Sequence, residues 1–180
     1  MLSDLQTKKL TRYFQVYDID DDGRIEQSDF ESIIENVRML RGSGAHSDTL
    51  RLAYMSRWNR LRAAADMDGD QSVDLDEWLA HWQLILEDDE RFEKEAQAIT
   101  DRLFRVFDLD EDDAIGPAEF ADFYGVFGLS VDLARTVFQE LDTNEDGIIT
   151  RAELLQHSKD FYRGDDSEAA GNLLFGPIGV

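Results

Sequence analysis

The twelve-residue segment Asp142–Glu153 places oxygen-bearing side chains at a spacing that suits a hard metal cation. Asp142, Asn144 and Asp146 supply side-chain oxygens at the first, third and fifth positions of this segment. Glu153 at position 12 can offer two carboxylate oxygens, and Ile148 at position 7 can offer its backbone carbonyl. Because calcium takes about six to eight oxygen ligands, this spacing predicts a calcium-binding loop.

Position 6 of the same segment is Gly147, and glycine readily adopts the positive φ that turns a loop around its ion. The complete pattern is that of the EF-hand, in which a twelve-residue loop joins two helices. The alternative interpretation is an acidic surface turn. It is weakened by the recurrence of the pattern elsewhere in the chain.

Three further loops begin at Asp18, Asp66 and Asp108, so the sequence predicts four calcium sites. The predicted ligands, including the position-7 carbonyls, are Asp18, Asp20, Asp22, Arg24 and Asp29; Asp66, Asp68, Asp70, Ser72 and Glu77; Asp108, Asp110, Asp112, Ala114 and Glu119; and Asp142, Asn144, Asp146, Ile148 and Glu153. We expect all four loops to be able to bind Ca²⁺, the third and fourth most securely, with Mg²⁺ possible in some of them.

The first two loops depart from the standard pattern in different ways. The first ends in Asp29, which is one methylene shorter than glutamate, and we expect a site weaker for calcium or more tolerant of magnesium. The second has Gly69 at position 4 and Gln71 at position 6. A residue other than glycine in the positive-φ turn costs about 1 kcal/mol, so we expect a modest backbone penalty there.

The third loop also lacks glycine at position 6, where it carries Asp113. Aspartate tolerates left-handed geometry better than most residues. Gly116 at position 9 offers no side-chain ligand, so water is expected to complete the shell, and Pro117 suits the first turn of the next helix.

Apolar residues at helical spacing flank every loop, which predicts four helix-loop-helix units. Position 8 of the loops is always apolar, with Ile25, Val73, Ile115 and Ile149, and we expect short antiparallel pairing of the first loop with the second and of the third with the fourth. The predicted fold is all-α, with two EF-hand pairs in one compact body. Residues 1–89 and 90–163 form the pairs, and residues 164–180 form a tail that packs on the body.

Connections between the units carry their own signals. Gly42-Ser43-Gly44 indicates a break in the first long connection, with Ser47 or Asp48 as a cap for the next helix. The acidic run Glu87–Arg91 between the halves is interpreted as a helix start or linker rather than a binding patch. The apolar tail residues Leu173, Leu174, Phe175, Ile178 and Val180 favour packing over a frayed end.

Composition excludes several function classes. With 18 basic and 40 acidic residues among 180, the net charge of -22 would repel nucleic acid and anionic membranes. Without cysteine, disulfides and thiol chemistry are ruled out. We expect a cytoplasmic monomer without a signal peptide, a membrane anchor or an evident protein target. The sequence also lacks a nucleophile-base constellation, which indicates that the protein is not an enzyme.

The four loops, the long first connection and the ending that contains Leu-Leu-Phe-Gly-Pro together resemble the sarcoplasmic calcium-binding proteins of invertebrates and their bacterial counterpart calerythrin. This resemblance covers nearly the whole chain. It implies a compact helical Ca²⁺ and Mg²⁺ buffer with its tail against the body. Members of that family often lose one of four sites, whereas here positions 1, 3, 5 and 12 bear oxygen in every loop.

The residues are compatible with three functions. A buffer is favoured over a sensor because only 4 methionines are available for a flexible target groove, beside 11 Phe, 3 Trp and 5 Tyr suited to a fixed core. A small apolar ligand is the third alternative, since the coelenterazine-binding proteins and photoproteins resemble this chain. Residues that could line such a cavity are Trp58, Trp78, Trp82, Tyr124 and Phe161, with His81 or His157 as polar contacts.

Overall fold

The computed structural model describes residues 1–41, 47–108 and 110–178, and within these ranges the chain is helical with two short strand pairs. The helices are α1 (Asp4–Tyr17), α2 (Gln27–Arg41), α3 (Ser47–Ala65), α4 (Leu75–Leu86), α5 (Asp89–Phe107), α6 (Pro117–Val126), α7 (Val131–Leu141), α8 (Arg151–Arg163) and the short 3₁₀ helix η1 (Ala170–Leu173). The predicted break at Gly42-Ser43-Gly44 and the tail residue Val180 lie outside what is described. Ser47 and Asp48, which were expected to cap the next helix, are the first two residues of α3.

Local sequence signals account for several helix boundaries. Ser3 begins α1 with a capping box, in which its hydroxyl accepts from the Gln6 N–H at 3.2 Å. Asp88 caps α5 by accepting from the Arg91 N–H at 3.0 Å, which confirms that the acidic run 87–91 starts a helix. Pro117 stands in the first turn of α6, as expected from its fixed φ.

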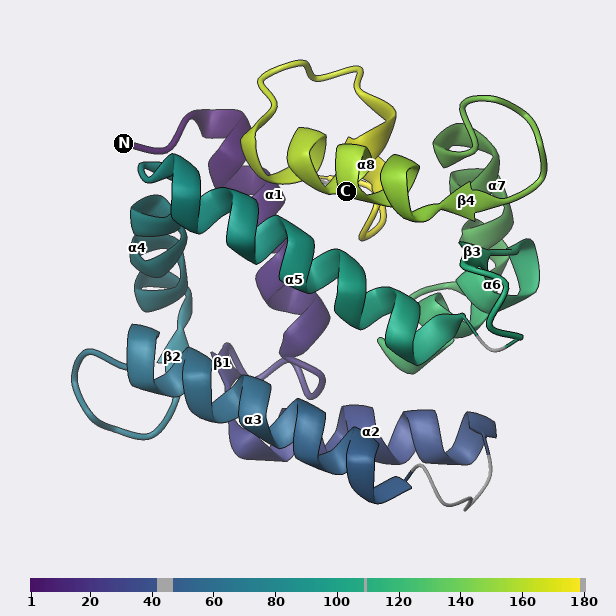
Figure 1. Ribbon diagram of the computed structural model, residues 1–180. Coiled ribbons are helices and arrows are strands. Elements are labelled where there is room, and N and C mark those ends of the chain that lie inside the picture. The colour runs from purple at the N-terminus through teal and green to yellow at the C-terminus, as the bar shows by residue number, and fades with distance from the viewer. Residues whose placement is uncertain (42–46, 109, 179–180) are drawn as a thin grey trace.

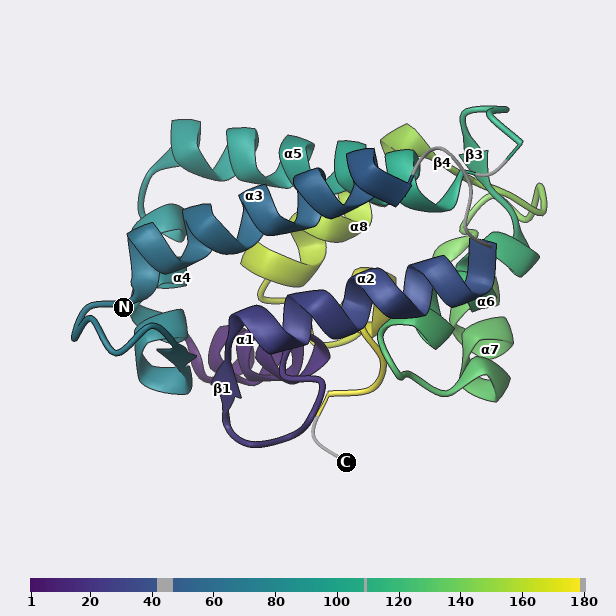
Figure 2. The same ribbon diagram turned by 90° about the horizontal axis from the view of Figure 1, so that it is seen from below.

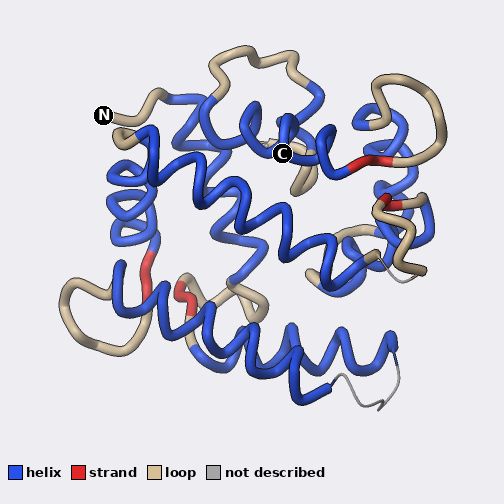
Figure 3. Tube along the Cα trace, in the orientation of Figure 1, coloured by secondary structure: helices blue, strands red, loops and turns tan. Residues whose placement is uncertain are grey.

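The strands are β1 (Arg24–Ile25), β2 (Val73–Asp74), β3 (Ala114–Ile115) and β4 (Ile149–Thr150). β1 pairs antiparallel with β2, with Ile25 opposite Val73, and β3 pairs with β4, with Ile115 opposite Ile149. The predicted pairing of neighbouring loops through their position-8 residues is therefore confirmed. Figure 3 shows the two strand pairs in red on opposite sides of the molecule.

Helices from different units pack against one another around one interior. α5 contacts both α4 and α8 and crosses the middle of the molecule in Figure 1, with α1 behind it. α2 lies beside α3, as both Figure 1 and Figure 2 show, and α2 also contacts α6 of the second pair. The two halves thus share contacts along several helices while their loop pairs stay at opposite ends.

The core is dominated by aromatic rings. Trp78, Trp82 and Tyr162 are buried together, and the Trp82 and Tyr162 rings stack with centroids 4.6 Å apart. Tyr13 of α1 lies 5.2 Å from Trp78 between ring centroids. Such rings bury large apolar areas and prefer these tilted or stacked geometries, so they fix how α1, α4 and α8 meet.

The tail closes this core from one side. Leu174 is fully buried and Phe175 is 2% exposed, with the Phe175 ring stacked on Tyr13 at a centroid distance of 4.4 Å. Gly171 approaches α8 so closely that an added Cβ would lie 2.5 Å from the carbonyl oxygen of His157, a contact that only glycine avoids.

Lys9 and Arg12 of α1 hold the tail through hydrogen bonds. The buried Lys9 Nζ donates to the carbonyls of Asp160 and Gly164 at 2.9 and 2.6 Å, and to Asn172 Oδ1 at 3.1 Å. Arg12 Nε donates to the Phe175 carbonyl at 2.8 Å. Burial lowers the pKa of Lys9 from its ordinary value, an effect opposed by Asp165 and Asp160. These bonds satisfy the ammonium group inside the protein.

Candidate metal sites

Three of the four loops fold around their position-1 aspartate through the same pair of backbone hydrogen bonds. In the fourth loop the N–H groups of Asp146 and Gly147 donate to the two carboxylate oxygens of Asp142 at 3.1 and 2.9 Å. The first loop repeats this arrangement at Asp18, and the third at Asp108, with distances of 3.0 to 3.1 Å. These bonds hold the position-1 carboxylates in the loop interior, where a cation would meet them.

The second loop uses a different donor because its glycine is displaced. Gly69 at position 4, instead of the residue at position 5, donates to Asp66 Oδ1 at 2.7 Å, and Gln71 donates to Oδ2 at 3.2 Å. Gln71 has φ of 74° and Asp113 of the third loop has φ of 63°, which confirms the positive φ expected at position 6. Position 4 is also left-handed in every loop, a feature that the sequence reasoning did not anticipate; the residues are Asp21, Gly69, Glu111 and Glu145.

Three loops bring carboxylates close enough to share one ion. The oxygens of each group lie within 4.8 Å of one another, and the groups are Asp18, Asp20 and Asp22; Asp66, Asp68 and Asp70; and Asp108, Asp110 and Glu119. In the fourth loop Asn144 takes one carboxylate's place and is hydrogen bonded to Asp146. Oxygen donors alone at this spacing suit a hard cation such as Ca²⁺ or Mg²⁺.

The position-12 carboxylates are placed differently from loop to loop. Asp29 accepts from the N–H groups of Ile19 and Glu26 at 2.9 and 2.7 Å, so both of its oxygens are held by backbone. Glu77 makes the corresponding bonds in the second loop, whereas Glu119 lies within the carboxylate group of the third. Glu153 accepts from the N–H of Thr150 at 3.0 Å. Asp112 at position 5, and Asp29, Glu77 and Glu153 at position 12, fall outside the three carboxylate groups.

Burial gives the first loop a distinct electrostatic environment. Asp18 and Asp29 are 6% and 3% exposed, and burial raises the pKa of both carboxyls above the ordinary value, while backbone N–H bonds partly oppose the rise. The charged forms of these groups are therefore disfavoured without a partner. A bound divalent cation would supply the compensating charge.

The position-7 carbonyl donors lie at or beside the strands. Arg24 and Ala114 begin β1 and β3, and Ser72 and Ile148 directly precede β2 and β4. Strand pairing thus fixes these carbonyls relative to the neighbouring loop. All twenty predicted ligand positions lie within the described part of the chain, and their role as ligands is proposed from this geometry.

Two arginines that bridge the loops of a pair were missed by the sequence reasoning. Arg24 crosses from the first loop to Asp70 and Ser72 of the second. Arg151 crosses from α8 to Asp113 of the third loop, with Nη2 to Oδ1 at 2.7 Å. The available signal was a basic residue within two positions of the paired apolar residue, because a side chain there can reach the opposite loop. Hydrogen bonds from Ser72 and Arg24 lower the pKa of Asp70 to about 2.

Replacing Gln71 by glycine is expected to stabilise the metal-free protein by about 0.5 to 1 kcal/mol, because the φ of 74° costs glycine little. The matched control is Gly147→Ala at the same position of the fourth loop, where φ is 87°. This substitution should destabilise the metal-free protein by about 1 kcal/mol. Urea unfolding of both chelator-treated variants measures the difference. Equal destabilisation by the two substitutions would contradict the strain at position 71.

Lengthening Asp29 to glutamate is expected to raise the calcium affinity of the first loop by about tenfold and to reduce competition by magnesium, because the longer side chain can offer both oxygens to the ion. The reverse change, Glu77→Asp in the second loop, should weaken calcium there. The Gly23 amide, which donates to Asp18 at 3.0 Å, reports the first loop by NMR titration. An unchanged Gly23 titration would show that side-chain length at position 12 does not limit this site.

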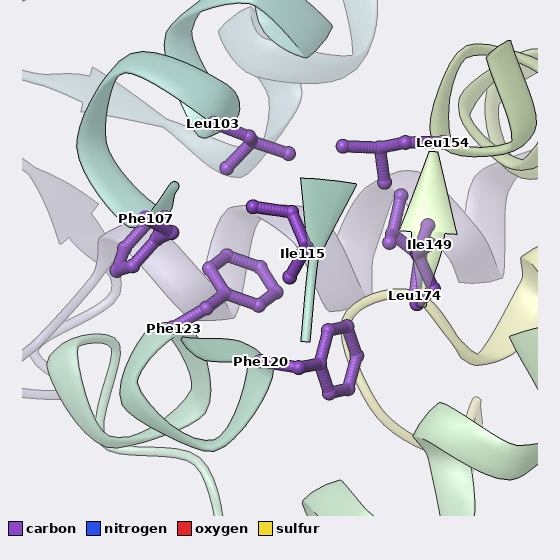
Figure 4. A pocket seen from close by; sticks show the side chains of 8 residues that line it. All are labelled: Leu103, Phe107, Ile115, Phe120, Phe123, Ile149, Leu154 and Leu174. Carbon is purple, nitrogen blue, oxygen red and sulfur yellow. The ribbon is translucent and has the colours of Figure 1, made fainter. Parts of the chain in front are cut away.

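Two small cavities lie among the described residues of the interior. Each holds about 20 Å³, enough for one water molecule. Figure 4 shows the one around Ile115 and Ile149, with Leu174 of the tail on its wall. None of the five aromatic residues suggested for a ligand cavity lines either of them. His157 is buried with Nε2 2.6 Å from the Leu141 carbonyl, and burial lowers the pKa of His81.

Comparisons with known proteins agree with this architecture. A family model for an EF-hand domain pair matches residues 111–160, and one for an EF hand matches residues 11–34. Calerythrin of Saccharopolyspora erythraea is 26% identical over 169 residues, covering 91% of this chain and 96% of that protein. The sarcoplasmic calcium-binding protein of Hediste diversicolor is 27% identical, covering 98% of this chain and 99% of its own length.

A solved structure of the coelenterazine-binding protein from Renilla muelleri, in its calcium-loaded apo form, has the same fold, with a TM-score of 0.78 at 23% identity. That alignment covers 98% of this chain and 100% of the other. The fold, the four loops and these matches make the chain an EF-hand calcium-binding protein. Over nearly its whole length it is similar to the sarcoplasmic calcium-binding proteins and calerythrin. Its described helices include none with the length and apolar character needed to cross a membrane.

Proposed function

We propose that this protein is a cytoplasmic Ca²⁺ and Mg²⁺ buffer whose four loops each hold one ion without recruiting a protein target. In each loop, the aspartates at positions 1, 3 and 5, or asparagine in one case, supply single oxygens. The position-7 carbonyl and the position-12 carboxylate complete the protein's share of the shell. We further propose that residues 1–89 and 90–163 work as two pairs.

The observation that carries this proposal is the covered apolar surface of the helices. A sensor exposes a hydrophobic groove when its helix pairs open. In this chain Phe175 from the tail fills the space between Tyr13 and Phe123, with centroid distances of 4.4 and 6.1 Å. Opening a groove there would require expulsion of a residue that is 2% exposed.

Methionine placement supports the same conclusion. Met39 and Met67 are about 70% exposed, yet one lies on α2 and the other in the second loop. These two exposed methionines therefore do not share a helix face. Adaptable binding grooves instead gather flexible methionines in one place.

An apolar dye distinguishes a buffer from a sensor. Dye fluorescence should stay unchanged when calcium is added to magnesium-loaded protein, because a buffer exchanges ions without exposing its core. The chain truncated after Asp166 serves as the positive control, since it lacks the covering residues Leu174 and Phe175. A calcium-dependent rise in the full chain, comparable with that of the truncated control, would establish a sensor instead.

The ions themselves are assigned by titration calorimetry. Chelator-stripped protein should bind four calcium ions, and magnesium present beforehand should reduce the apparent calcium affinity of the first loop most. A stoichiometry below four would remove one loop from the proposed set, and the position-12 variants identify which one.

A further inference from the structure

Arg24 occupies a position that connects the two loops of the N-terminal pair. It begins β1, where its backbone stands opposite Asp74 of β2. Its guanidinium forms an ion pair with Asp70, and Nη1 also donates to Ser72 Oγ at 2.6 Å. Its own carbonyl is the proposed position-7 ligand of the first loop. One residue therefore belongs to the first loop through its backbone and to the second through its side chain.

Asp70 has both carboxylate oxygens engaged within the protein. Oδ1 accepts from the Ser72 N–H at 2.8 Å and from the Ser72 hydroxyl at 2.7 Å, while Oδ2 faces Arg24. Asp70 also lies in the carboxylate group with Asp66 and Asp68. A divalent ion that enters this group and takes an oxygen of Asp70 must compete with the guanidinium for the same negative charge.

We propose that Arg24 is a built-in competitor for the metal site of the second loop, which sets the affinity of that site below the value its carboxylates alone would give. This inference rests on the proposed function, because it requires that the second loop bind a divalent ion. Filling the site moves Asp70 from the guanidinium to the ion and leaves Arg24 to solvent or to neighbouring carboxylates.

The C-terminal pair supplies a matched comparison. Arg151 likewise bridges two segments, with Nη2 on Asp113 at 2.7 Å and Nη1 on Asp101 at 3.0 Å. Asp113, however, stands at position 6 of the third loop and is not among the proposed ligands. Removal of either arginine deletes one positive charge beside a loop pair, but only Arg24 contacts a ligand carboxylate directly.

The test compares Arg24→Gln, Arg24→Lys and Arg151→Gln with the natural chain in NMR calcium titrations. The position-6 amides report the loops separately, because each donates to its own position-1 aspartate; they belong to Gly23, Gln71, Asp113 and Gly147. We expect R24Q to raise the affinity reported by Gln71 about two- to fivefold, the scale of a partly exposed ion pair. R24K should retain most of the competition.

A second readout uses the protein without metal. Since Arg24 neutralises part of the acidic cluster of the second loop, chelator-treated R24Q should melt about 1 to 3 °C below the natural chain. The same substitution thus weakens the metal-free fold and strengthens calcium binding. If Arg24 had only a structural role, its replacement would lower both the melting temperature of the metal-free protein and the calcium affinity.

The outcomes separate the inference from the proposed function. An equal affinity gain at all four loops, or a gain at the second loop as large in R151Q as in R24Q, would show that Arg24 acts only through the net charge of the protein. Either result would overturn this inference and leave the proposed function intact. A loss of affinity at the second loop in R24Q would also overturn it. A Gln71 amide that never responds to calcium in the natural chain would remove the proposed second site, and the competitor with it.

Discussion

Calcium is expected to raise the melting temperature of the chelator-stripped protein by at least about 10 °C. An ion that binds only the folded chain raises the free energy of unfolding by about 4 kcal/mol per site when its concentration is a thousand times its dissociation constant. At this chain length, 1 kcal/mol of unfolding free energy corresponds to about 2 to 4 °C in melting temperature. The structural cause is the crowding of carboxylates within 4.8 Å in three loops of a chain with net charge -22. Calorimetric melting with and without calcium measures the shift.

Two controls separate specific binding from general screening. Potassium chloride at matched ionic strength should reproduce only a small part of the shift, because it screens exposed charges without occupying the loops. A variant with Asp29→Asn, Glu77→Gln, Glu119→Gln and Glu153→Gln should lose most of the calcium effect. Equal melting of the natural chain in calcium and in chelator would contradict the proposed sites.

Replacement of Phe175 by alanine is expected to cost about 3 to 5 kcal/mol of unfolding free energy, as for other large core residues. The ring is 2% exposed, stacks on Tyr13 and meets Phe161 at a centroid distance of 4.9 Å. Its loss would leave a cavity between α1 and α8 that rigid aromatic neighbours cannot close. Urea unfolding of the calcium-loaded protein measures the cost.

Phe175→Leu is the conservative partner of that substitution and should cost less, since much of the volume remains. Val131→Ala at a residue that is 54% exposed should change stability by less than about 0.5 kcal/mol. Truncation after Asp166 should combine the loss of stability with new binding of an apolar dye. A truncated chain that melts normally and binds no dye would show that the tail does not stabilise the body.

Much of this architecture follows from sequence because its determinants are local. A twelve-residue loop places its oxygens by spacing alone, so Asp142 to Glu153 could be recognised without any distant contact. The strand pairs were equally accessible, because Ile115 and Ile149 occupy the same position in successive repeats and form opposite partners in β3 and β4. Even the positive φ at Gln71 follows from comparison of the loops.

Contacts between distant segments were not predictable in the same way. The pattern around Arg24 indicates that its side chain can reach the opposite loop. It does not identify Asp70 as the partner, because that depends on how strand pairing places the two loops. The partners of Lys9 lie more than 150 residues away, and an apolar tail alone does not indicate which helices receive it. The left-handed residue at position 4 was missed because Asp21 and Glu145 carry no glycine signal.

The hydrogen bonds of Lys9 also bear on how the chain folds as it is made. Asn172 follows Lys9 by 163 residues, and at about 5 to 20 residues per second the ribosome needs roughly 8 to 33 s to add it. During that time the ammonium group of α1 lacks an acceptor that it has in the finished protein. The native packing of α1 is therefore completed only after the tail has left the ribosome.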